Sequence, residues 1–395
     1  VYRSKILVLN LWQNKPHVSH PDIVAFLKLN YPKKCKNKRA ANLVQAVVKK
    51  NASMKNRKLN FVDRFLTLWI FLAMGVGVIL GNIFPNIDHW LNQFAVGTTN
   101  IPLAIGLIIM MVPPLVKVDF KKIPIVFQNR KLLFLSLLIT WVVGPFLMFL
   151  LALAFLQYEP EYLTGLIIIG LAPCIAMVIV WNELAGGSRE LAAGLVGVNS
   201  LLQVFFFSAY AWFYLEIMLP LFGFDSIQID LSFWEVAKTV GIYLGLPFGM
   251  AVILRYWISS KKGETYLNTQ FIPRISPFTL YALLFTIVVM FSLKGQLIAA
   301  LPFDVLKVAL PLVIFFLIMF FLMFFVAKWQ GATYQETATV AFTAAGNNFE
   351  LAIAVAIGVF GLNSGQAFAG VIGPLVEVPA LILLVKASLS LKKYF

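Results

Sequence analysis

Ten long apolar segments set the strongest constraint on how this chain of 395 residues can fold. A transmembrane helix needs about 20 consecutive, mostly apolar residues. Ten runs meet this requirement, at residues 65–84, 94–116, 132–157, 162–182, 191–221, 233–258, 277–298, 306–327, 337–360 and 367–390. The chain is 60% hydrophobic and 12% charged, whereas an average soluble domain is about 45–50% apolar and about 25% charged. The sequence therefore predicts an all-α membrane protein with ten transmembrane helices.

The sign of the charged residues alternates from one predicted loop to the next. If the N-terminus is cytoplasmic, the basic residues of the cytoplasmic loops and the C-terminal end are Lys117, Lys121, Lys122, Arg130, Lys131, Arg189, Lys261, Lys262, Arg274, Lys328, Lys392 and Lys393. The loops on the other side carry acids, namely Asp88, Glu159, Glu161, Asp225, Asp230 and Asp304. An excess of Lys and Arg in cytoplasmic loops is the rule for multi-pass membrane proteins. The pattern predicts ten spans in the cell membrane, with both termini in the cytoplasm.

The net charge of +15 is concentrated in the N-terminal tail. Residues 1–64 hold 15 of the 32 Lys and Arg residues and only two acids, Asp22 and Asp63. A basic segment next to a membrane is attracted to anionic lipid headgroups. We therefore expect residues 1–58 to form a weakly ordered cytoplasmic tail on the bilayer, and residues 59–395 to form the transmembrane domain. Because the charge is confined to this tail, the sequence argues against a nucleic-acid partner.

The ten runs divide into two sets of five, residues 65–221 and 233–390. An odd number of spans in each set inverts the second set relative to the first. The fourth run of each set is interrupted, by Pro173 in LAPCIAMV and by Gly346 and Asn347 in TAAGNNFELA. Paired interruptions at matching places are the best sequence indication of a transporter's binding site. We therefore expect two inverted five-helix repeats, with the fourth and ninth helices broken and crossing each other.

Cys174 follows Pro173 directly and is the only cysteine in the apolar runs. A lone Cys in a membrane helix usually fills space as a small apolar residue. Here the proline removes a backbone donor and opens the helix beside the sulfur. Thiolates select soft partners, such as a trivalent arsenic or antimony centre. Cys174 is thus either an apolar filler or a ligand for a soft substrate.

Two glutamates lie within predicted spans, Glu350 in the ninth and Glu377 in the tenth. Acids at membrane depth are rare and mark functional sites by default. Loss of water favours the neutral form of a carboxyl group, which suits a proton carrier, and no Lys or Arg lies near either acid in its own span. The alternative is a buried structural carboxylate. Asn347 and Asn348, next to Gly346, offer amide groups to a substrate at the same break.

A further polar stripe, Asn199, Ser200 and Gln203, lies in the fifth run. Polar side chains within a membrane helix often form hydrogen bonds to neighbouring helices. The sequence leaves both a structural role and a role in the site open for this stripe.

Three blocks, GLAPCIAMVIVWNELAGGSRELAAGLVGVNSLLQVFFFSAYAWFYL, FTAAGNNFELAIAVAIGVFG and GPLVEVPALILLV, resemble the arsenite efflux permeases of the arsenical-resistance-3 type. That family lies in the bile acid/sodium symporter superfamily. The resemblance covers residues 59–390 and implies a panel domain and a core domain with crossed helices four and nine. It also implies export of arsenite, and in some members antimonite, in exchange for protons. By the match, Cys174 is the family's critical cysteine, and Glu350 and Glu377 are its charged membrane residues.

The chain departs from this family in two respects. Many members carry Arg before the cysteine, where this chain has Pro173, which favours neutral arsenous acid over an anion as the substrate. Some members carry further membrane cysteines, whereas Cys174 stands alone here, so a cage of three thiolates cannot form within one transmembrane domain. A single sulfur–arsenic bond selects As(III) and still allows its release.

Three other functions remain as alternatives. A sodium-coupled organic-anion symporter shares the fold, but we would expect it to show a larger polar sodium cage and it has no need of Cys174. A passive channel needs neither Glu377 nor a counter-ion. An intramembrane enzyme is disfavoured because the three histidines, His17, His20 and His89, lie outside the runs. No cofactor is expected.

Overall fold

The computed structural model describes residues 66–84, 87, 93, 95–96, 99–175, 177–224, 233–293 and 301–395. They belong to one compact unit, Phe65–Phe395. The expected tail at residues 1–58, including Cys35, lies outside the described residues.

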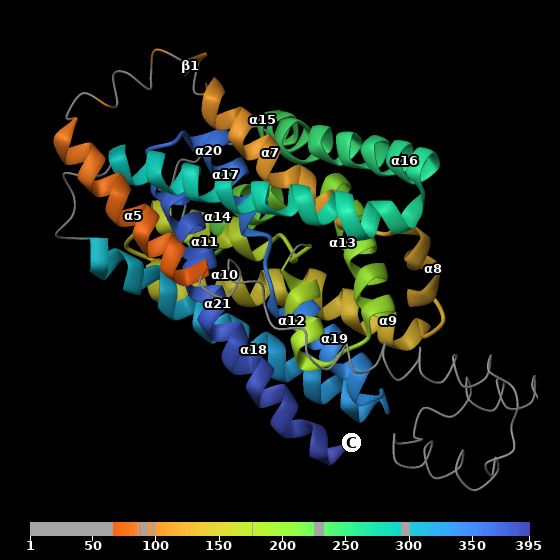
Figure 1. Cartoon of the computed structure of the whole chain (residues 1–395). Helices are drawn as coiled ribbons and strands as arrows, with labels where there is room; N and C mark the ends of the chain where they lie inside the picture. The colour runs from red at the N-terminus through yellow and green to blue at the C-terminus, as the bar shows by residue number, and fades with distance from the viewer. Residues whose placement is uncertain are drawn as a thin grey trace, which may run out of the picture. The chain divides into compact units, whose positions relative to one another are not determined.

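The described part is helical apart from two paired two-residue strands, β1 (Ala95–Val96) and β2 (Thr99–Asn100). Its first half contains α5 (Leu66–Ile83), α7 (Ile101–Lys117), η1 (Phe120–Lys122), α8 (Ile123–Val126), α9 (Arg130–Leu138), η2 (Ile139–Val143), α10 (Gly144–Leu156), α11 (Pro160–Gly170), α12 (Val178–Ala185), α13 (Arg189–Trp212), η3 (Phe213–Met218) and α14 (Leu219–Leu221). Its second half contains α15 (Phe233–Val240), η4 (Gly241–Gly245), α16 (Leu246–Tyr266), η5 (Leu267–Phe271), α17 (Ile272–Leu293), α18 (Leu301–Trp329), α19 (Tyr334–Ala345), α20 (Phe349–Phe360), α21 (Gly365–Leu391) and η7 (Lys392–Tyr394). Each of the ten apolar runs overlaps one helix or one end-to-end pair of helices (Figure 1).

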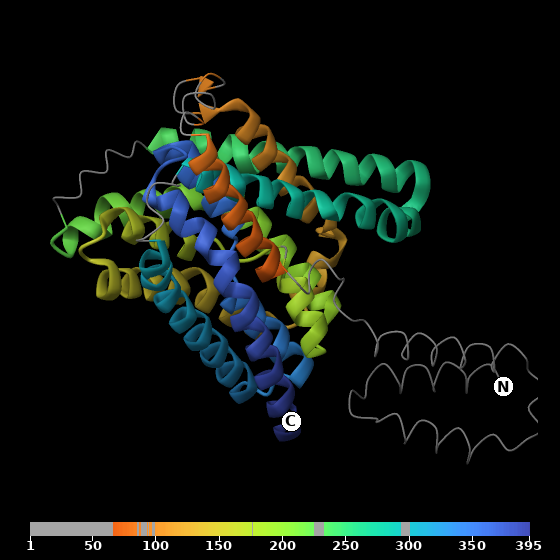
Figure 2. The same cartoon turned by 60° about the vertical axis from the view of Figure 1, so that its left-hand side comes forward.

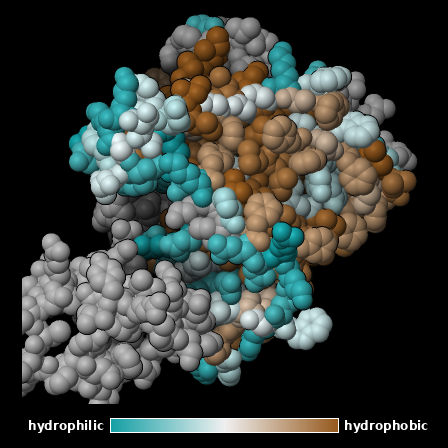
Figure 3. All heavy atoms as spheres, turned by 90° about the vertical axis from the view of Figure 1, so that its right-hand side faces the viewer, coloured by the Kyte–Doolittle hydropathy of each residue, from teal (hydrophilic) through white to brown (hydrophobic). Residues whose placement is uncertain are grey.

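Many helices expose large apolar side chains, as expected of a surface that faces lipid. Examples are Phe71 on α5, Ile253 on α16 and Phe325 on α18, with exposed fractions of 54%, 70% and 54%. Figure 3 shows a broad hydrophobic area on one face with hydrophilic side chains at its borders. Five helical segments among the described residues have the length and hydropathy to cross a membrane. The chain is thus a multi-pass membrane protein.

The helices pack in two groups. A panel group consists of α5, α7, α16 and α17, and a core group consists of α10 to α13 and α18 to α21. In the panel group, α16 and α17 both pack against α7, and in the core group α18 lies beside α21 (Figures 1 and 2). The polar groups predicted to form the site all lie on helices of the core group or in the breaks between them.

One connection is tighter than the sequence predicts. We expected a loop at residues 259–276, but this region is helical on both sides of a bend within α16, and the π-helical segment η5 continues directly into α17. Gly263 makes the bend with a φ of 81°, a conformation that glycine adopts without strain. The buried Arg255 holds this corner to the end of α7, because its guanidinium donates a hydrogen bond of 2.8 Å to the carbonyl of Val116.

Both predicted interruptions are present. In the fourth apolar run, α11 ends at Gly170 and α12 begins at Val178. Pro173 lies in the non-helical segment between these two helices. In the ninth run, α19 ends at Ala345 and α20 begins at Phe349. The helix is interrupted because Gly346 is extended (φ −84°, ψ 146°), and Asn348 caps the start of α20. Aromatic contacts fix both sides of this second break to α18, with ring centroids 4.9 Å apart for Phe320 and Phe342 and 6.4 Å apart for Phe316 and Phe349.

Candidate substrate site at the crossing of two interrupted helices

The two interrupted segments meet as a short antiparallel pair centred on Pro173 and Asn347. The amide of Cys174 donates a hydrogen bond of 2.9 Å to the carbonyl of Gly346, and the amide of Asn348 donates one of 2.7 Å to the carbonyl of Ala172. Backbone groups without partners are costly in an apolar environment. Each break therefore supplies partners for backbone groups that the other break leaves free.

Gly346 brings a thiol and a carboxyl group to the same place. A Cβ atom at this position would lie 2.9 Å from the Cβ of Cys174 and 3.4 Å from Oε1 of Glu377. A distance below 3.0 Å between such atoms is sterically excluded, so the crossing requires glycine here. Cys174 and Glu377, which are far apart in the sequence, thus both lie against the backbone of Gly346.

Glu377 is buried in α21 between Pro374 and Pro379, with an exposed fraction of 3%. Its Oε1 atom has no hydrogen-bond partner among the described residues. An unsatisfied buried acceptor costs free energy, and such atoms in native proteins call for an explanation. The carboxyl group of Glu377 thus places a buried acceptor at the crossing.

Glu350 has a different environment, in the first turn of α20. A helix N-terminus stabilises a negative charge. Lys117, at the end of α7 in the panel group, also attracts this carboxylate. The sequence predicts no Lys or Arg near Glu350 within its own span, and Lys117 belongs to a different helix, at the end of α7. Glu377 is repelled by Glu350 instead. The two acids therefore differ in their electrostatic environments.

The two asparagines at the break have separate roles. Asn348 is the N-cap of α20, since its side-chain oxygen accepts a hydrogen bond of 3.2 Å from the amide of Leu351. The side chain of Asn347 donates a bond of 2.8 Å to the carbonyl of Ile169, while its oxygen is buried and has no partner among the described residues. Asn347 thus keeps a buried acceptor without a partner among the described residues, whereas Asn348 mainly maintains the break.

The polar stripe on α13, formed by Asn199, Ser200 and Gln203, also contains residues with different roles. Asn199 accepts a hydrogen bond of 3.1 Å from the indole of Trp141, and Ser200 bonds to Val196 within its own helix. Gln203, by contrast, reaches the crossing. Its side-chain nitrogen donates to the carbonyl of Pro173, and its oxygen accepts a bond of 2.8 Å from the side chain of Asn348. The sequence left the role of Gln203 open, and the structure brings it to the site.

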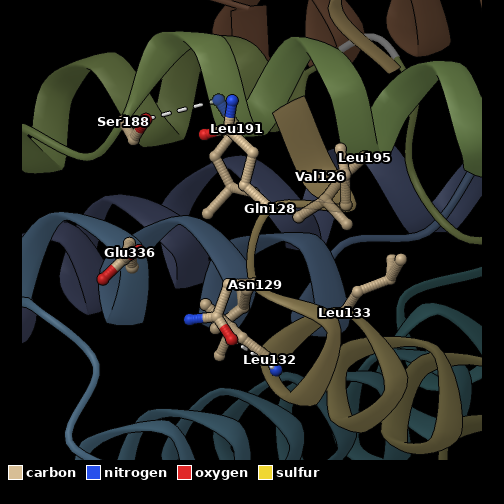
Figure 4. Close-up of a pocket in the computed structure, with 10 residues that line it drawn as sticks. Val126, Gln128, Asn129, Leu132, Leu133, Ser188, Leu191, Leu195 and Glu336 are labelled. Atoms are coloured by element: carbon tan, nitrogen blue, oxygen red, sulfur yellow. Dashed lines mark hydrogen bonds between the residues drawn. The ribbon is translucent and has the colours of Figure 1, made fainter. Parts of the chain in front are cut away.

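A separate pocket of about 210 Å³ opens nearer the ends of α9, α13 and α19. Figure 4 shows its polar rim, which includes Asn129, Ser188 and Glu336. None of the residues predicted for the substrate site lines it. It is therefore distinct from the crossing.

Two broken helices that exchange backbone hydrogen bonds beside buried carboxyl and amide groups are the site architecture of secondary transporters. Comparison with known proteins narrows this class. Residues 104–301 match the model of the Sodium Bile acid symporter family. The chain belongs to this family, in which it groups with the arsenical-resistance proteins Acr3.

Three relatives illustrate the similarity. The chain is 46% identical over 337 residues to the arsenical-resistance protein Acr3 of Corynebacterium glutamicum, a match that covers 85% of this chain and 91% of that protein. It is 31% identical over 356 residues to Acr3 of Alkaliphilus metalliredigens, covering 87% and 97% of the two chains. It is also 33% identical over 347 residues to an uncharacterized transporter of Synechocystis, slr0944, covering 83% and 88%. These matches extend over most of the transmembrane domain.

Proposed function

We propose that this protein exports arsenite, as arsenous acid, across the cell membrane in exchange for protons. The names of the two Acr3 relatives support the substrate class. The observation that carries the mechanism is the position of Cys174 and Glu377 against Gly346, which brings a soft ligand and a proton acceptor to one buried point. Antimonite, which has the same preference for sulfur, is a second substrate of the same chemistry.

The proposal includes a topology of ten spans with both termini in the cytoplasm. The two halves, about 65–221 and 233–390, are inverted repeats, and α11–α12 and α19–α20 are their broken fourth helices. The distribution of basic and acidic loop residues supports this orientation. In this arrangement, movement of the core group against the panel group gives the crossing access to each side of the membrane in turn.

The substrate is the neutral acid rather than an anion. Arsenous acid presents hydroxyl groups, which need acceptors, and the Oδ1 atom of Asn347 and the Oε1 atom of Glu377 are both buried acceptors without partners among the described residues. Pro173 stands where many family members have Arg, so no guanidinium precedes Cys174 to hold an anion. Glycerol and boric acid also carry hydroxyl groups, but only a substrate with a soft centre bonds to the sulfur.

Binding joins arsenic to the sulfur of Cys174. The thiol proton passes to the carboxylate of Glu377, the sulfur attacks arsenic, and one arsenic–oxygen bond breaks. The departing hydroxide takes the proton from Glu377 and leaves as water. On release, water attacks arsenic and the same proton transfers run in reverse, so that thiol and arsenous acid are restored.

A proton on Glu377 weakens binding, because a hydroxyl group of the bound substrate donates a stronger hydrogen bond to a carboxylate than to a neutral carboxyl group. Protons from the outside therefore favour release of arsenous acid, and the protonated site returns empty. Glu350, beside Lys117 and Glu377, is the second carboxyl in this coupling, and the two acids titrate as a pair. The substrate and the proton thus alternate at one site, as an antiporter requires.

Everted membrane vesicles test the proposal directly. We expect arsenite uptake into vesicles that are acidified inside, and loss of uptake when an ionophore removes the proton gradient. Uptake that follows a sodium gradient and ignores the proton gradient would favour an organic-anion type of symporter. Uptake that ignores both gradients would indicate a channel.

A further inference from the structure

The contacts at the crossing repeat with a fixed offset in the sequence. The hydrogen bond from Cys174 to Gly346 has its counterpart in the bond from Asn348 to Ala172, since each residue of one bond lies 174 positions from its equivalent in the other. Pro173 and Asn347, which pair with each other, are separated by the same offset. The crossing therefore has an internal two-fold relation.

The same offset relates Gln203 on α13 to Glu377 on α21. Both side chains are buried, with exposed fractions of 0% and 3%, and each lies on the helix that follows its broken helix. A glutamine and a glutamate have nearly the same shape. One of the two equivalent positions thus holds an amide, which is always neutral, and the other holds a carboxyl group.

The hydrogen bonds of Gln203 indicate the structural role of a side chain at either of the two equivalent positions. Its nitrogen donates to the carbonyl of Pro173 in its own half, and its oxygen accepts from the side chain of Asn348 in the other half. It thereby ties the two broken segments together. We name this pair of contacts the clamp.

The two-fold relation assigns the partners of the second clamp. The equivalent of Pro173 is Asn347, and the equivalent of Asn348 is Cys174. By this relation, the partners expected for Glu377 are the carbonyl of Asn347 in its own half and the side chain of Cys174 in the other half. The proximity of Cys174 and Glu377 at Gly346 agrees with this assignment.

We propose that Gln203 is a positioning residue, whose amide permanently closes one half of the crossing with the contacts that Glu377 makes and breaks in the other half. The fixed clamp holds the two segments in register while ligation of arsenic to Cys174 opens the second clamp. Gln203 itself does not touch the substrate. The inference rests on the proposed function only for the event that opens the second clamp.

The test measures access to Cys174 rather than transport. In a Cys35→Ser background, Cys174 is the only thiol of the chain. Its rate of alkylation by N-ethylmaleimide is measured in membranes without arsenite, for Gln203→Met, for Gln203→Glu and for the parent. Ser200→Ala is the matched control, because Ser200 is equally buried on α13 and bonds only within its helix.

We expect Gln203→Met, which can neither donate nor accept these bonds, to raise the alkylation rate about tenfold at every pH. Gln203→Glu should raise the alkylation rate of Cys174 to the same extent at pH 8, because its carboxylate has no proton to donate to the carbonyl of Pro173. At about pH 5.5 its rate should return towards that of the parent at the same pH, because a protonated glutamate restores the donor. Ser200→Ala should match the parent throughout.

Two results would overturn the assignment. One is an alkylation rate within about twofold of the parent for both Gln203 variants, at matched amounts of protein in the membrane. The other is equal pH dependence for Gln203→Glu and Gln203→Met, which would reduce Gln203 to a packing residue. Failure of the parent to export arsenite would refute the proposed function instead and would leave these alkylation results unaffected.

Discussion

The backbone amide of Cys174 and the carbonyl of Gly346 are joined by a hydrogen bond of 2.9 Å between two helices that both stop at membrane depth. This bond fixes the sulfur-bearing residue to the one position in the crossing where no side chain fits. The backbone of Cys174 is therefore joined to the backbone of the other interrupted segment.

Replacing the sulfur tests its role as ligand. Cys174→Ser keeps nearly the same volume and a polar hydrogen, but oxygen does not bind As(III) as a soft thiolate does. We expect loss of arsenite resistance in a sensitive host, with unchanged amounts of protein in the membrane. Cys35→Ser is the control and should keep full resistance. Full resistance of Cys174→Ser would move the substrate site to Asn347 and its neighbours.

Removing the charge of Glu377 separates binding from coupling. Glu377→Gln should abolish export driven by a pH gradient, because an amide takes up and releases no proton and so cannot carry one through the transport cycle. Binding should stay measurable as protection of Cys174 from alkylation by arsenite, since ligation followed by loss of water involves no net uptake of protons. Glu350→Gln should give a partial defect. Export by Glu377→Gln at the wild-type rate at every pH would refute the proton-carrier role.

A methyl group at Gly346 tests the crossing by steric means. In Gly346→Ala, the new Cβ would press on the Cβ of Cys174 at 2.9 Å, so the two segments must separate. We expect export to fall about tenfold or more, with a destabilisation of about 1–3 kcal/mol. Gly75→Ala on α5 is the control, because nothing lies within 4 Å of its new Cβ. Equal export by the two variants would contradict the close packing at the site.

The corner between α16 and α17 gives a prediction on stability and pH. A hydrogen bond of 2.8 Å from Lys121 lowers the pKa of Glu264 below its usual value, and the guanidinium of Arg255 lies 3.4 Å from the same carboxylate. A carboxyl group with a lowered pKa stabilises the fold above its unfolded pKa of about 4.3, and the effect is lost as pH falls through the folded pKa.

Glu264→Gln should therefore reduce the thermal stability of the purified protein at pH 7 by less than about 1 kcal/mol, since the pair is exposed. The difference from the wild type should vanish near pH 4. Glu190→Gln, at an exposed acid of α13, serves as control and should leave the thermal stability unchanged at both pH 7 and pH 4. A stability difference that persists unchanged at pH 4 would rule out the ion pair as its cause.

The sequence predicted the local features of the site better than its contacts. The interruptions at Pro173 and Gly346 follow from the backbone chemistry of single residues, which acts locally. The proximity of Cys174 and Glu377 depends on how separate helices pack, which no local pattern records. The attraction between Lys117 and Glu350 has the same origin, because the two residues belong to different helices.

A signal for Gln203 was nevertheless present in the sequence. Gln203 follows Pro173 by the same 30 positions that separate Glu377 from Asn347. A comparison of the two halves at a fixed offset would have paired these residues. Without the contacts of the crossing, however, nothing in the sequence distinguishes this offset from neighbouring ones.

The electrostatic attraction between Lys117 of the panel group and Glu350 of the core group gives the last prediction. Lys117→Met would leave a carboxylate at the crossing without its cation, and an unpaired buried charge is strongly unfavourable. We expect a marked loss of export.

In the double variant Lys117→Met/Glu350→Gln the charge is absent, so the cost of the unpaired carboxylate should disappear. Export by the double variant should then equal that of Glu350→Gln alone rather than fall to the product of the two defects, and rates in everted vesicles measure this coupling in a double-mutant cycle. Independent, multiplicative defects would show that Lys117 acts on export by a route other than Glu350.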